Sequence, residues 1–378
     1  MSNTGDESNG RALTQEIEDA RRMVLDEGRP DAVARQHKYG KYTARERIAR
    51  LCDGDSFHEY GSLVEPLRDT GFNKDLVAPA DGVITGSGMI DGRPVSLLSR
   101  DYTVLGGSTG KHGADKANRA VTQATEQGLP FVALQEGGGH RIQDGQDSRH
   151  FSAASPVFEF LARNSGWVPT AMAMLGQGFA GPTNWAALAD FGVMVRGQAT
   201  MGMAGPALVK AGLGQEIDKE ALGGAALQTN RYGISDLAVD TEDEALAAVR
   251  RFLSYLPSNA RQPLPIQEND DPITRAEEEL LEIIPANPRK SYDVRRIIEL
   301  ISDKDSVFEK KPSYARNIVT SFACLNGRPV GFVANQTRHL AGMLDVKACE
   351  KASHFIGLCD AFGLPLVMLI DLPGFAIG

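Results

Sequence analysis

Asp91-Gly92-Arg93-Pro94-Val95 is repeated further along the chain as Asn326-Gly327-Arg328-Pro329-Val330. The step from 91 to 326 is an offset of 235 positions, and the same offset continues without a gap for about fifty residues. Within it, Gly128-Leu129-Pro130 and Gly363-Leu364-Pro365 each lead into an apolar run. A gapless match of this length indicates one structural unit that occurs twice.

Length and composition agree with two globular units. The chain has 378 residues, of which 42% are hydrophobic and 24% charged, and its net charge is −9. This charge argues against nucleic acid as the main partner, because phosphate binding needs a basic surface. The four cysteines form no CxxC pair, and no apolar run reaches membrane-spanning length. We therefore expect a cytoplasmic protein with reduced thiols, no membrane contact and no metal site.

The order of the predicted elements indicates an α/β fold. In the first unit, helices are predicted at 111–128, 154–165 and 183–189, and strands at 131–134, 170–175 and 191–195, with loops at 137–139 and 176–182. In the second unit, helices are predicted at 293–302 and 345–362, and strands at 319–325, 330–334 and 366–370. Thr43 with Glu46 predicts a capping box for a further helix. Such alternation is typical of mostly parallel sheets with crossover helices.

Composition also predicts the domain boundaries. Residues 1–12 have no apolar pattern and predict a disordered tail. Pro, Asn and Asp are frequent around 256–285, which is typical of a linker. We therefore predict an N-terminal domain over 13–265, a linker over 266–285 and a partial C-terminal domain over 286–378.

No familiar set of catalytic side chains is evident. The chain has no His or carboxylate cluster at metal-ligand spacing. The stretch Gly107-Ser108-Thr109-Gly110-Lys111-His112 is not a nucleotide-binding P-loop. Leu105 stands where the leading Gly is needed, and His112 replaces the Ser/Thr that would hold magnesium.

Glycine is concentrated in two loops that follow strands. These loops are Glu136-Gly137-Gly138-Gly139-His140-Arg141 and Gly176-Gln177-Gly178-Phe179-Ala180-Gly181-Pro182. Loops at the carboxyl ends of parallel strands are where α/β sheets carry their sites. Small residues there let backbone N–H groups point at a ligand oxygen, and two such donors stabilise an oxyanion by about 3 kcal/mol each. The alternative is that the glycines only satisfy tight turns.

A series of short stretches then carries a family resemblance, and it runs in one order from about residue 30 to the end. They are Tyr42-Thr43-Ala44-Arg45-Glu46-Arg47-Ile48, Tyr102-Thr103-Val104-Leu105-Gly106-Gly107-Ser108, Gly138-Gly139-His140-Arg141-Ile142-Gln143, Gly205-Pro206, Leu222-Gly223-Gly224-Ala225, Tyr314-Ala315-Arg316-Asn317-Ile318, Asn335-Gln336, Leu344-Asp345, Cys359-Asp360-Ala361-Phe362 and Asp371-Leu372-Pro373-Gly374-Phe375. As a set they resemble the carboxyltransferase β subunits of biotin-dependent acetyl-/propionyl-CoA carboxylases. The resemblance implies tandem ClpP/crotonase-like domains, of which the second copy is incomplete here.

The resemblance also implies an activity. Such a subunit transfers a carboxyl group from carboxybiotin to the α-carbon of an acyl-CoA, through an enolate held in backbone oxyanion holes. The implied oxyanion donors are Gly138, Gly139, Ala180 and Gly181. The implied acyl-CoA contacts are Gly106, Gly107, Ser108, Lys111, Arg141, Gly205 and Pro206. The implied biotin-side residues are Asn335, Gln336, Pro373, Gly374 and Phe375.

Several of these residues also fit roles other than the implied ones. Lys111 and Arg141 fit either phosphate contacts or ion pairs, whereas Arg45 and Arg47 are expected in surface or interface ion pairs. His140, Phe179 and Trp185 depart from the family pattern and leave the acyl group open.

The implied partners are a biotin carboxylase and a biotin carrier subunit, together with further copies of the chain in a dimer or hexamer. The chain has no Met-Lys-Met biotin-attachment site and no ATP-grasp signature, so biotin and ATP are expected on other subunits. The counterpart of the second glycine loop would fall beyond Gly378, which favours a fragment or a site completed by another chain. The alternatives are a biotin-linked decarboxylase subunit and a non-catalytic CoA-binding scaffold.

Overall fold

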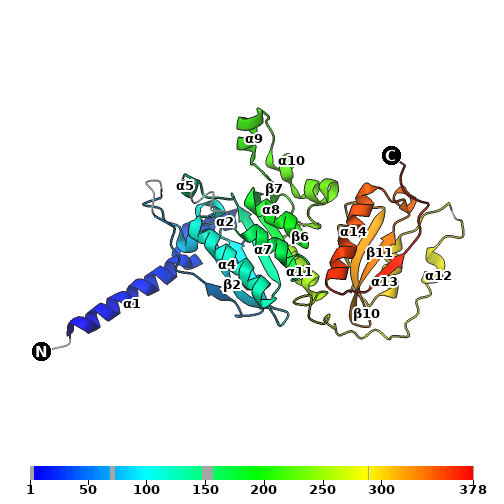
Figure 1. The fold of residues 1–378 in the computed structure, drawn as a ribbon, viewed down its shortest axis with the longest axis horizontal. Helices are drawn as coiled ribbons and strands as arrows, with labels where there is room; N and C mark the ends of the chain where they lie inside the picture. Colours follow the sequence, from blue (N-terminus) through cyan, green and yellow to red (C-terminus); the bar gives the residue numbers. More distant parts are fainter. Residues whose placement is uncertain (1–3, 69–72, 147–155, 288, 378) are drawn as a thin grey trace.

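The computed structural model describes residues 4–68, 73–146, 156–287 and 289–377. Two sheets organise them, and we call the parts built on these sheets the first unit and the second unit (Figure 1). The first sheet has eight strands: β1 (His58–Tyr60), β2 (Val83–Ile90), β3 (Arg93–Arg100), β4 (Phe131–Gly137), β5 (Thr170–Phe179), β6 (Phe191–Val195), β7 (Thr200–Gly202) and β8 (Leu237–Val239). The second has four: β9 (Phe308–Lys310), β10 (Ile318–Leu325), β11 (Arg328–Asn335) and β12 (Leu366–Leu369).

Parallel pairing dominates the first sheet, as the alternating pattern predicted. Its order is β1-β2-β3-β4-β5-β6-β8, with β7 beside β5, and every pair from β3 onward is parallel. Only β1, β2 and β3 pair antiparallel. Because parallel strands end at one edge, the loops after β4 and β5 lie next to each other.

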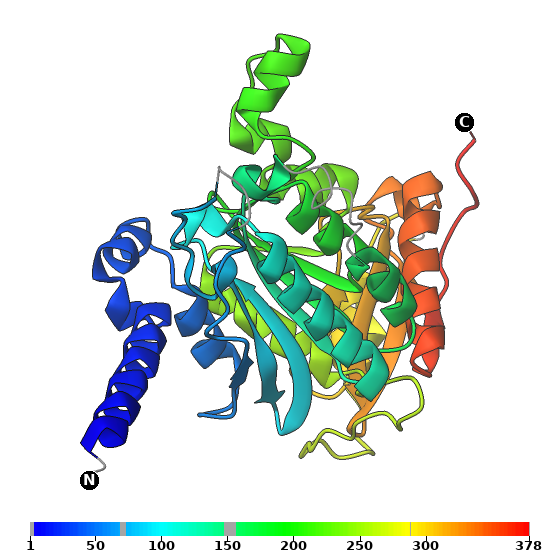
Figure 2. The ribbon, with the colours of Figure 1, turned by 60° about the vertical axis from the view of Figure 1, so that its left-hand side comes forward.

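Helices cover both faces of the first sheet (Figure 2). On one face lie α4 (Lys111–Gln127), α7 (Val157–Asn164) and α8 (Gly181–Leu188), which share a core with the strands. On the other lie α3 (Ala44–Leu51) and α11 (Glu242–Ser254). The other α-helices in the described residues of this part are α1 (Thr4–Val24), α2 (Pro30–Lys38), α5 (Ile142–Gly145), α9 (Pro206–Leu213) and α10 (Lys219–Gly223). The predicted capping box at Thr43 and Glu46 is present at the start of α3.

The second unit repeats this plan. Its sheet order is β12-β11-β10-β9, with α13 (Val294–Ile301) on one face and α14 (Val346–Ala361) on the other (Figure 1). Asp91-Gly92 and Asn326-Gly327 both form two-residue hairpin turns with positive φ. This conformation favours Asn, Asp and Gly, which explains why these positions match.

The duplication extends to a buried lysine in each unit. Lys116 donates to the carbonyls of Ala80 and Val83. Lys351, its counterpart at the offset of 235, donates to the carbonyls of Tyr314 and Ile318. The two side chains are 7% and 3% exposed. Each ammonium therefore satisfies carbonyls at the entry to the unit's first long strand, which is a structural use of the charge.

Aromatic rings join the two units. Phe252 of α11 stacks on Phe191 with ring centroids 4.8 Å apart, and it also meets Phe322 of β10 at 6.0 Å. Phe322 in turn contacts Tyr255 at 5.4 Å and Phe355 of α14 at 5.0 Å. One hydrophobic core thus continues from α11 into the second unit.

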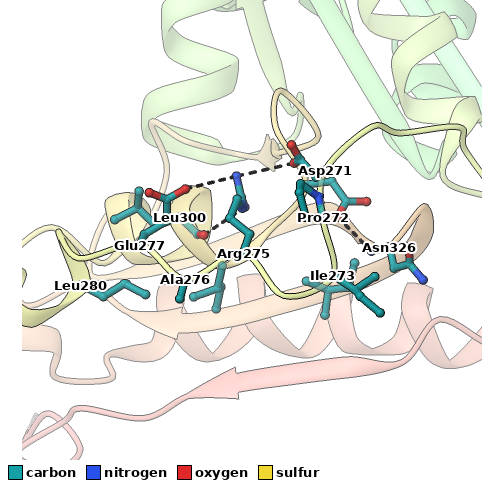
Figure 3. A pocket seen from close by; sticks show the side chains of 12 residues that line it. Asp271, Pro272, Ile273, Arg275, Ala276, Glu277, Leu280, Leu300 and Asn326 are labelled. Atoms are coloured by element: carbon teal, nitrogen blue, oxygen red, sulfur yellow. Dashed lines mark hydrogen bonds and ion pairs between the residues drawn. The ribbon is translucent and has the colours of Figure 1, made fainter.

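The connection between the units is attached to the second one. It contains α12 (Leu280–Ile283) and lines a cavity of about 320 Å³ against α13 and the β10–β11 turn (Figure 3). Arg275 lies at the centre of this cavity wall, within 3.5 Å of Asp271 and 3.6 Å of Glu277. It also donates to the carbonyl of Leu300 at 3.0 Å. The cation therefore sits at the negative end of the α13 dipole, where positive charge is stabilising.

Two predictions of local structure were wrong. Residues 1–12 were predicted as a disordered tail, but helix α1 begins at Thr4. Once the helix-forming stretch after Gly10 has nucleated, each further N-terminal residue can join the helix at little cost. The loop predicted at 176–182 begins later, because β5 runs on to Phe179 and pairs there with β7. Among the described helices, none is both long and apolar enough to cross a membrane.

Candidate active site

The two glycine loops of the first unit meet at the carboxyl edge of the sheet. A Cβ added at Gly139 would lie 3.0 Å from the Phe179 carbonyl oxygen and 4.0 Å from the Gly181 nitrogen. Gly139 also has φ +86°, which disfavours an L side chain. The structure therefore brings together the two loops that the sequence predicted as a pair.

Only some of the predicted donors have a free N–H. Gly138 donates its N–H to the Gly106 carbonyl at 3.3 Å, and Ala180 donates its N–H to the Gly202 carbonyl at 2.9 Å. In the described part of the chain, the N–H groups of Gly139 and Gly181 donate no hydrogen bond. A Cβ at Gly181 would meet nothing within 4 Å, so this amide borders open space. Of the four predicted donors, Gly139 and Gly181 are therefore the ones whose N–H groups are available to a ligand oxygen.

Local backbone geometry directs the Gly181 amide. Ala180 has φ 57° and ψ −115°, an unfavourable conformation for alanine that costs about 1–3 kcal/mol. Gly181 is the first residue of α8, where the N–H groups have no partner within the helix. The positive end of the helix dipole lies at the same place. This combination favours a negatively charged oxygen at the start of α8.

Glu136 anchors the first glycine loop and was not singled out from the sequence. Its carboxylate is fully buried and lies 2.6 Å from Lys41 Nζ and 2.7 Å from an Arg47 nitrogen. Gln36 Nε2 donates to it at 2.9 Å. The close approach of Gly107 to the Glu136 carbonyl leaves no room for a side chain at Gly107. The strand end that precedes Gly139 is thereby fixed from two sides.

Arg47 was expected in a surface or interface ion pair, and its surface placement was wrong. The side chain is completely buried and pairs with Glu242 at 2.7 Å as well as with Glu136. Burial lowers the pKa of Arg47, but hydrogen bonds and charge from Glu242 and Glu136 outweigh it, so the pKa is raised overall. The prediction failed because the two carboxylates that enclose Arg47, Glu136 of β4 and Glu242 of α11, lie far from it in the sequence. Arg45 does pair with a carboxylate, Glu59, at 2.7 Å.

Arg141 and Lys111 lie in ion pairs. The Arg141 guanidinium is 1% exposed and pairs with Asp81, and it also donates to the Ser108 carbonyl at 3.1 Å. Burial raises the pKa of Asp81 and outweighs the opposing effect of Arg141. Lys111 Nζ lies 2.6 Å from Asp115 on the same helix. Arg141 therefore braces the loops around Ser108 from inside and does not face a solvent-exposed phosphate.

The other predicted acyl-CoA residues lie around the two loops. Leu105, Gly106 and Gly107 form a left-handed turn beside the Glu136 carbonyl. Gly106 also borders a cavity of about 420 Å³ that Arg35, Tyr39 and Tyr102 line. Ser108 donates its hydroxyl to the Leu105 carbonyl at 2.9 Å.

Gly205 and Pro206 begin α9, which projects from the first unit (Figure 1). Phe179 connects them to the site, because its ring lies 3.6 Å from a Cβ built at Gly205. Phe179 thus packs against this segment. Trp185 is buried against Phe131 and Arg100, and exposed His140 lies near Gly145.

The predicted biotin-side residues occupy the corresponding edge of the second unit. Gly374 accepts a hydrogen bond from Leu344 N, as Gly139 does from Thr109 N in the first unit. Asn335 holds the turn through Gly342 at 2.9 Å, and Gln336 donates to Asp293 at 2.6 Å. Pro373 lines a cavity of about 560 Å³, and Phe375 is 70% exposed. Among the described residues, no group of three or more His, Cys, Asp and Glu could hold a metal ion.

Comparison with known proteins yields one consistent family. Residues 35–378 match the model of the carboxyl transferase domain. The carboxyltransferase subunit of propionyl-CoA carboxylase from Haloferax mediterranei is 39% identical over 364 residues, which are 96% of this chain and 70% of that protein. Methylmalonyl-CoA decarboxylase subunit alpha from Veillonella parvula is 38% identical over 92% of this chain and 68% of its own length.

A solved structure agrees with the sequence relatives. The hexameric transcarboxylase 12S, determined with hydrolysed methylmalonyl-coenzyme A bound, superimposes with a TM-score of 0.91 at 36% identity. The match covers 97% of this chain and 70% of that one. The predicted family and the tandem crotonase-like α/β fold are confirmed. The chain belongs to the carboxyl transferase domain family and is a carboxyltransferase subunit of the biotin-dependent acyl-CoA carboxylase type.

Proposed function

We propose that the first unit binds the acyl-CoA and holds its thioester enolate between the N–H groups of Gly139 and Gly181. The single observation that carries this proposal is the pair of free amides from adjacent loops, one of which begins α8. Donors fixed before the reaction stabilise the charge that develops on the thioester oxygen. Glu136, Arg47 and Lys41 act by keeping the first loop in place.

The chain binds and orients the acyl-CoA and excludes water from it, while its partner supplies the reactive group. Carboxybiotin on a carrier subunit supplies the CO2, and the ureido nitrogen of the biotin takes the α-proton. Two bonds break in this transfer, the acyl α-C–H bond and the biotin N–CO2 bond. Two bonds form, a C–C bond between the α-carbon and the CO2 carbon and an N–H bond on the biotin nitrogen. We place the biotin at the loops with Asn335, Gln336, Pro373, Gly374 and Phe375, on a second copy of the chain in a homo-oligomer.

The CoA phosphates are expected in the groove beside Gly106. Arg35 lines this cavity together with Tyr39 and Tyr102. A lysine or arginine in reach of a phosphate supplies a charge-assisted hydrogen bond. The overall charge of −9 does not oppose such a local cationic groove. Gly205 and Pro206 are expected to contact the acyl-CoA through the segment that packs against Phe179.

We propose carboxylation as the direction, with a propionyl-CoA carboxylase as the model for the assembly. Two of the relatives with a carboxylase name share 39% and 38% identity with this chain. The second candidate is the reverse reaction, transfer of a carboxyl group from an acyl-CoA to biotin, because a decarboxylase subunit is also 38% identical to this chain. Which carrier protein the chain accepts separates the two.

The test is carboxylation by the assembled enzyme of acyl-CoA with radiolabelled bicarbonate, using wild type and Gly139→Ala. Alanine at φ +86°, 3.0 Å from the Phe179 carbonyl, displaces the donor, so kcat is expected to fall by about 10²–10³-fold. Gly92→Ala is the matched control. Its φ is +71°, it lies in open space and it is remote from both loops. Full activity of Gly139→Ala, or an equal loss in the control, contradicts the proposed hole.

A further inference from the structure

Arg100, at the end of β3, is a buried cation without a counter-ion. It is 4% exposed, and among the described residues no carboxylate forms an ion pair with it or shifts its pKa. Its neighbours are neutral: Nε donates to Gln135 Oε1 at 2.7 Å, a terminal nitrogen donates to Thr109 Oγ1, and the Trp185 ring centroid lies 5.5 Å away. Burial lowers the pKa of Arg100 to about 10, so the guanidinium is still charged at neutral pH. Buried charges are normally paired, so a bound anion would stabilise the Arg100 guanidinium.

Gln135 adds an unused donor at the same place. Its side chain is fully buried, and its Nε2 has no hydrogen-bond partner. The orientation of the amide is fixed, because its oxygen must be the atom that faces the Arg100 donor. The unused N–H groups therefore lie beside the guanidinium. An unsatisfied donor in a fully buried position is rare in folded proteins, and here it adjoins an unpaired charge.

The second unit carries neither group at the matching positions. At the offset of 235, Arg100 corresponds to Asn335 and Gln135 to Ile370. Asn335 is neutral, and its amide is satisfied by Gly342 at 2.9 Å and by Asp371 N at 3.2 Å. Ile370 is apolar and 73% exposed. The polar pair is therefore a feature of the first unit alone.

The pair lies next to the two segments that carry the amides of the active site. Thr109, which Arg100 contacts, donates its N–H to the Gly139 carbonyl at 2.8 Å. Trp185, which lies over the guanidinium, is four residues after Gly181 on α8, about 6 Å along the helix axis. These contacts place Arg100 and Gln135 directly behind the loop of Gly139 and the first turns of α8.

We propose that Arg100 and Gln135 form a subsite for an acyl group that ends in a carboxylate, so that this carboxyltransferase acts on a dicarboxylic acyl-CoA. The inference rests on the proposed binding of acyl-CoA between Gly139 and Gly181 and specifies its substrate class. The guanidinium supplies the charge, and the Gln135 amide supplies a second hydrogen bond to the same carboxylate. An uncharged acyl end would leave the buried charge and the buried amide without a partner, which is the arrangement that rejects an analogue most strongly.

The experiment compares two thioesters with chains of equal length, glutaryl-CoA and valeryl-CoA. Their dissociation constants for the full chain are measured by calorimetry, and kcat/KM is measured in the assembled enzyme. Wild type is expected to prefer glutaryl-CoA by at least about 30-fold, the factor that corresponds to about 2 kcal/mol. Arg100→Gln removes the charge and should bring the two thioesters within about threefold of each other. Gln135→Leu keeps the charge and should reduce the preference by about three- to tenfold.

Each outcome supports the subsite or overturns it. Equal binding of both thioesters by wild type, or an unchanged ratio in Arg100→Gln, overturns the subsite and leaves the proposed carboxyltransferase reaction intact. A subsite that holds only chloride or water gives the first of these results. If neither thioester binds, the proposed acyl side of the first unit fails, and the subsite with it. If Arg100→Gln does not fold, the ratio in Gln135→Leu decides: a reduced preference supports the subsite, and an unchanged one overturns it.

Discussion

Replacing Glu136 by glutamine is expected to loosen the loop that carries Gly139 and to destabilise the first unit. The carboxylate accepts from Lys41, Arg47 and Gln36 at 2.6, 2.7 and 2.9 Å, and its exposed fraction is 0%. Glutamine keeps one acceptor oxygen and turns an amide toward one of the two cations. Lys41 is 11% exposed at its side chain and can turn to water, but Arg47 at 1% cannot.

The expected loss of stability follows from the ion pair that Arg47 keeps with Glu242. Removing one partner of a buried ion pair costs about 3–5 kcal/mol. Arg47 still holds Glu242 through two contacts of 2.7 Å, so a loss near the lower end, about 3 kcal/mol, is expected. With a urea slope of about 3 kcal/mol per M, the unfolding midpoint falls by about 1 M. A shift of about 1 Å in Gly139 lowers kcat by about 100-fold.

Tryptophan fluorescence during urea unfolding is a suitable assay. The two tryptophans of the chain, Trp167 and Trp185, both lie in the first unit, so the signal reports that unit alone. Glu242→Gln is the matched variant, because it removes the other carboxylate from Arg47 without touching β4. It should lose stability to a similar extent and retain more activity. A midpoint for Glu136→Gln within about 0.2 M of wild type would refute the view that this carboxylate holds the loop.

Three further predictions follow from buried groups elsewhere. The pKa of Lys351 is lowered by burial from 10.5 to about 7, so the folded protein releases a proton that the unfolded chain still holds, and stability rises with pH between these values. Lys351→Met should reduce the rise between pH 7 and pH 9 by about 2 kcal/mol in urea titrations followed by circular dichroism; an unchanged rise contradicts the assigned cause. Phe322→Ala removes a ring that contacts Phe252 across the two units, and should cost about 3–5 kcal/mol and speed proteolysis of the connecting segment; unchanged cleavage would mean that the rings do not hold the units together. Arg141→Lys keeps the charge but loses the buried fork on Asp81, so the thermal midpoint and kcat should fall with little change in KM for acyl-CoA; a selective rise in KM would instead restore Arg141 as a phosphate contact.

The sequence predicted the local elements well where one face of a helix or strand is buried. Helix α4 and strand β6 follow the predicted ranges closely, because their apolar residues repeat with the period of the element. The end of β5 was missed, since its last residues pair with β7, a strand that begins some twenty residues later. The tail at 1–12 was missed because helix propagation depends on the preceding turn more than on composition.

The candidate site was predicted at the level of loops and not of atoms. Both glycine loops were identified, but Gly138 and Ala180 were included as donors although their N–H groups are already used. Hydrogen bonds to Gly106 and Gly202 decide this, and neither partner is adjacent in the sequence. Arg47 was placed at the surface for the same reason, since Glu242 lies 195 residues away along the chain.

By itself, the sequence determined that this protein is one unit written twice and that it belongs with carboxyltransferases. Repeats, turn glycines and the order of motifs can be recognised in the sequence, because each depends on neighbouring residues. Only the tertiary structure decided which amides are free, which charges are paired and which are not. The free energy of a buried charge depends on all the groups around it, and these come from segments far apart in the chain. Arg100 and Arg47 are both arginines in strongly patterned segments, yet one is paired twice and the other meets only neutral groups.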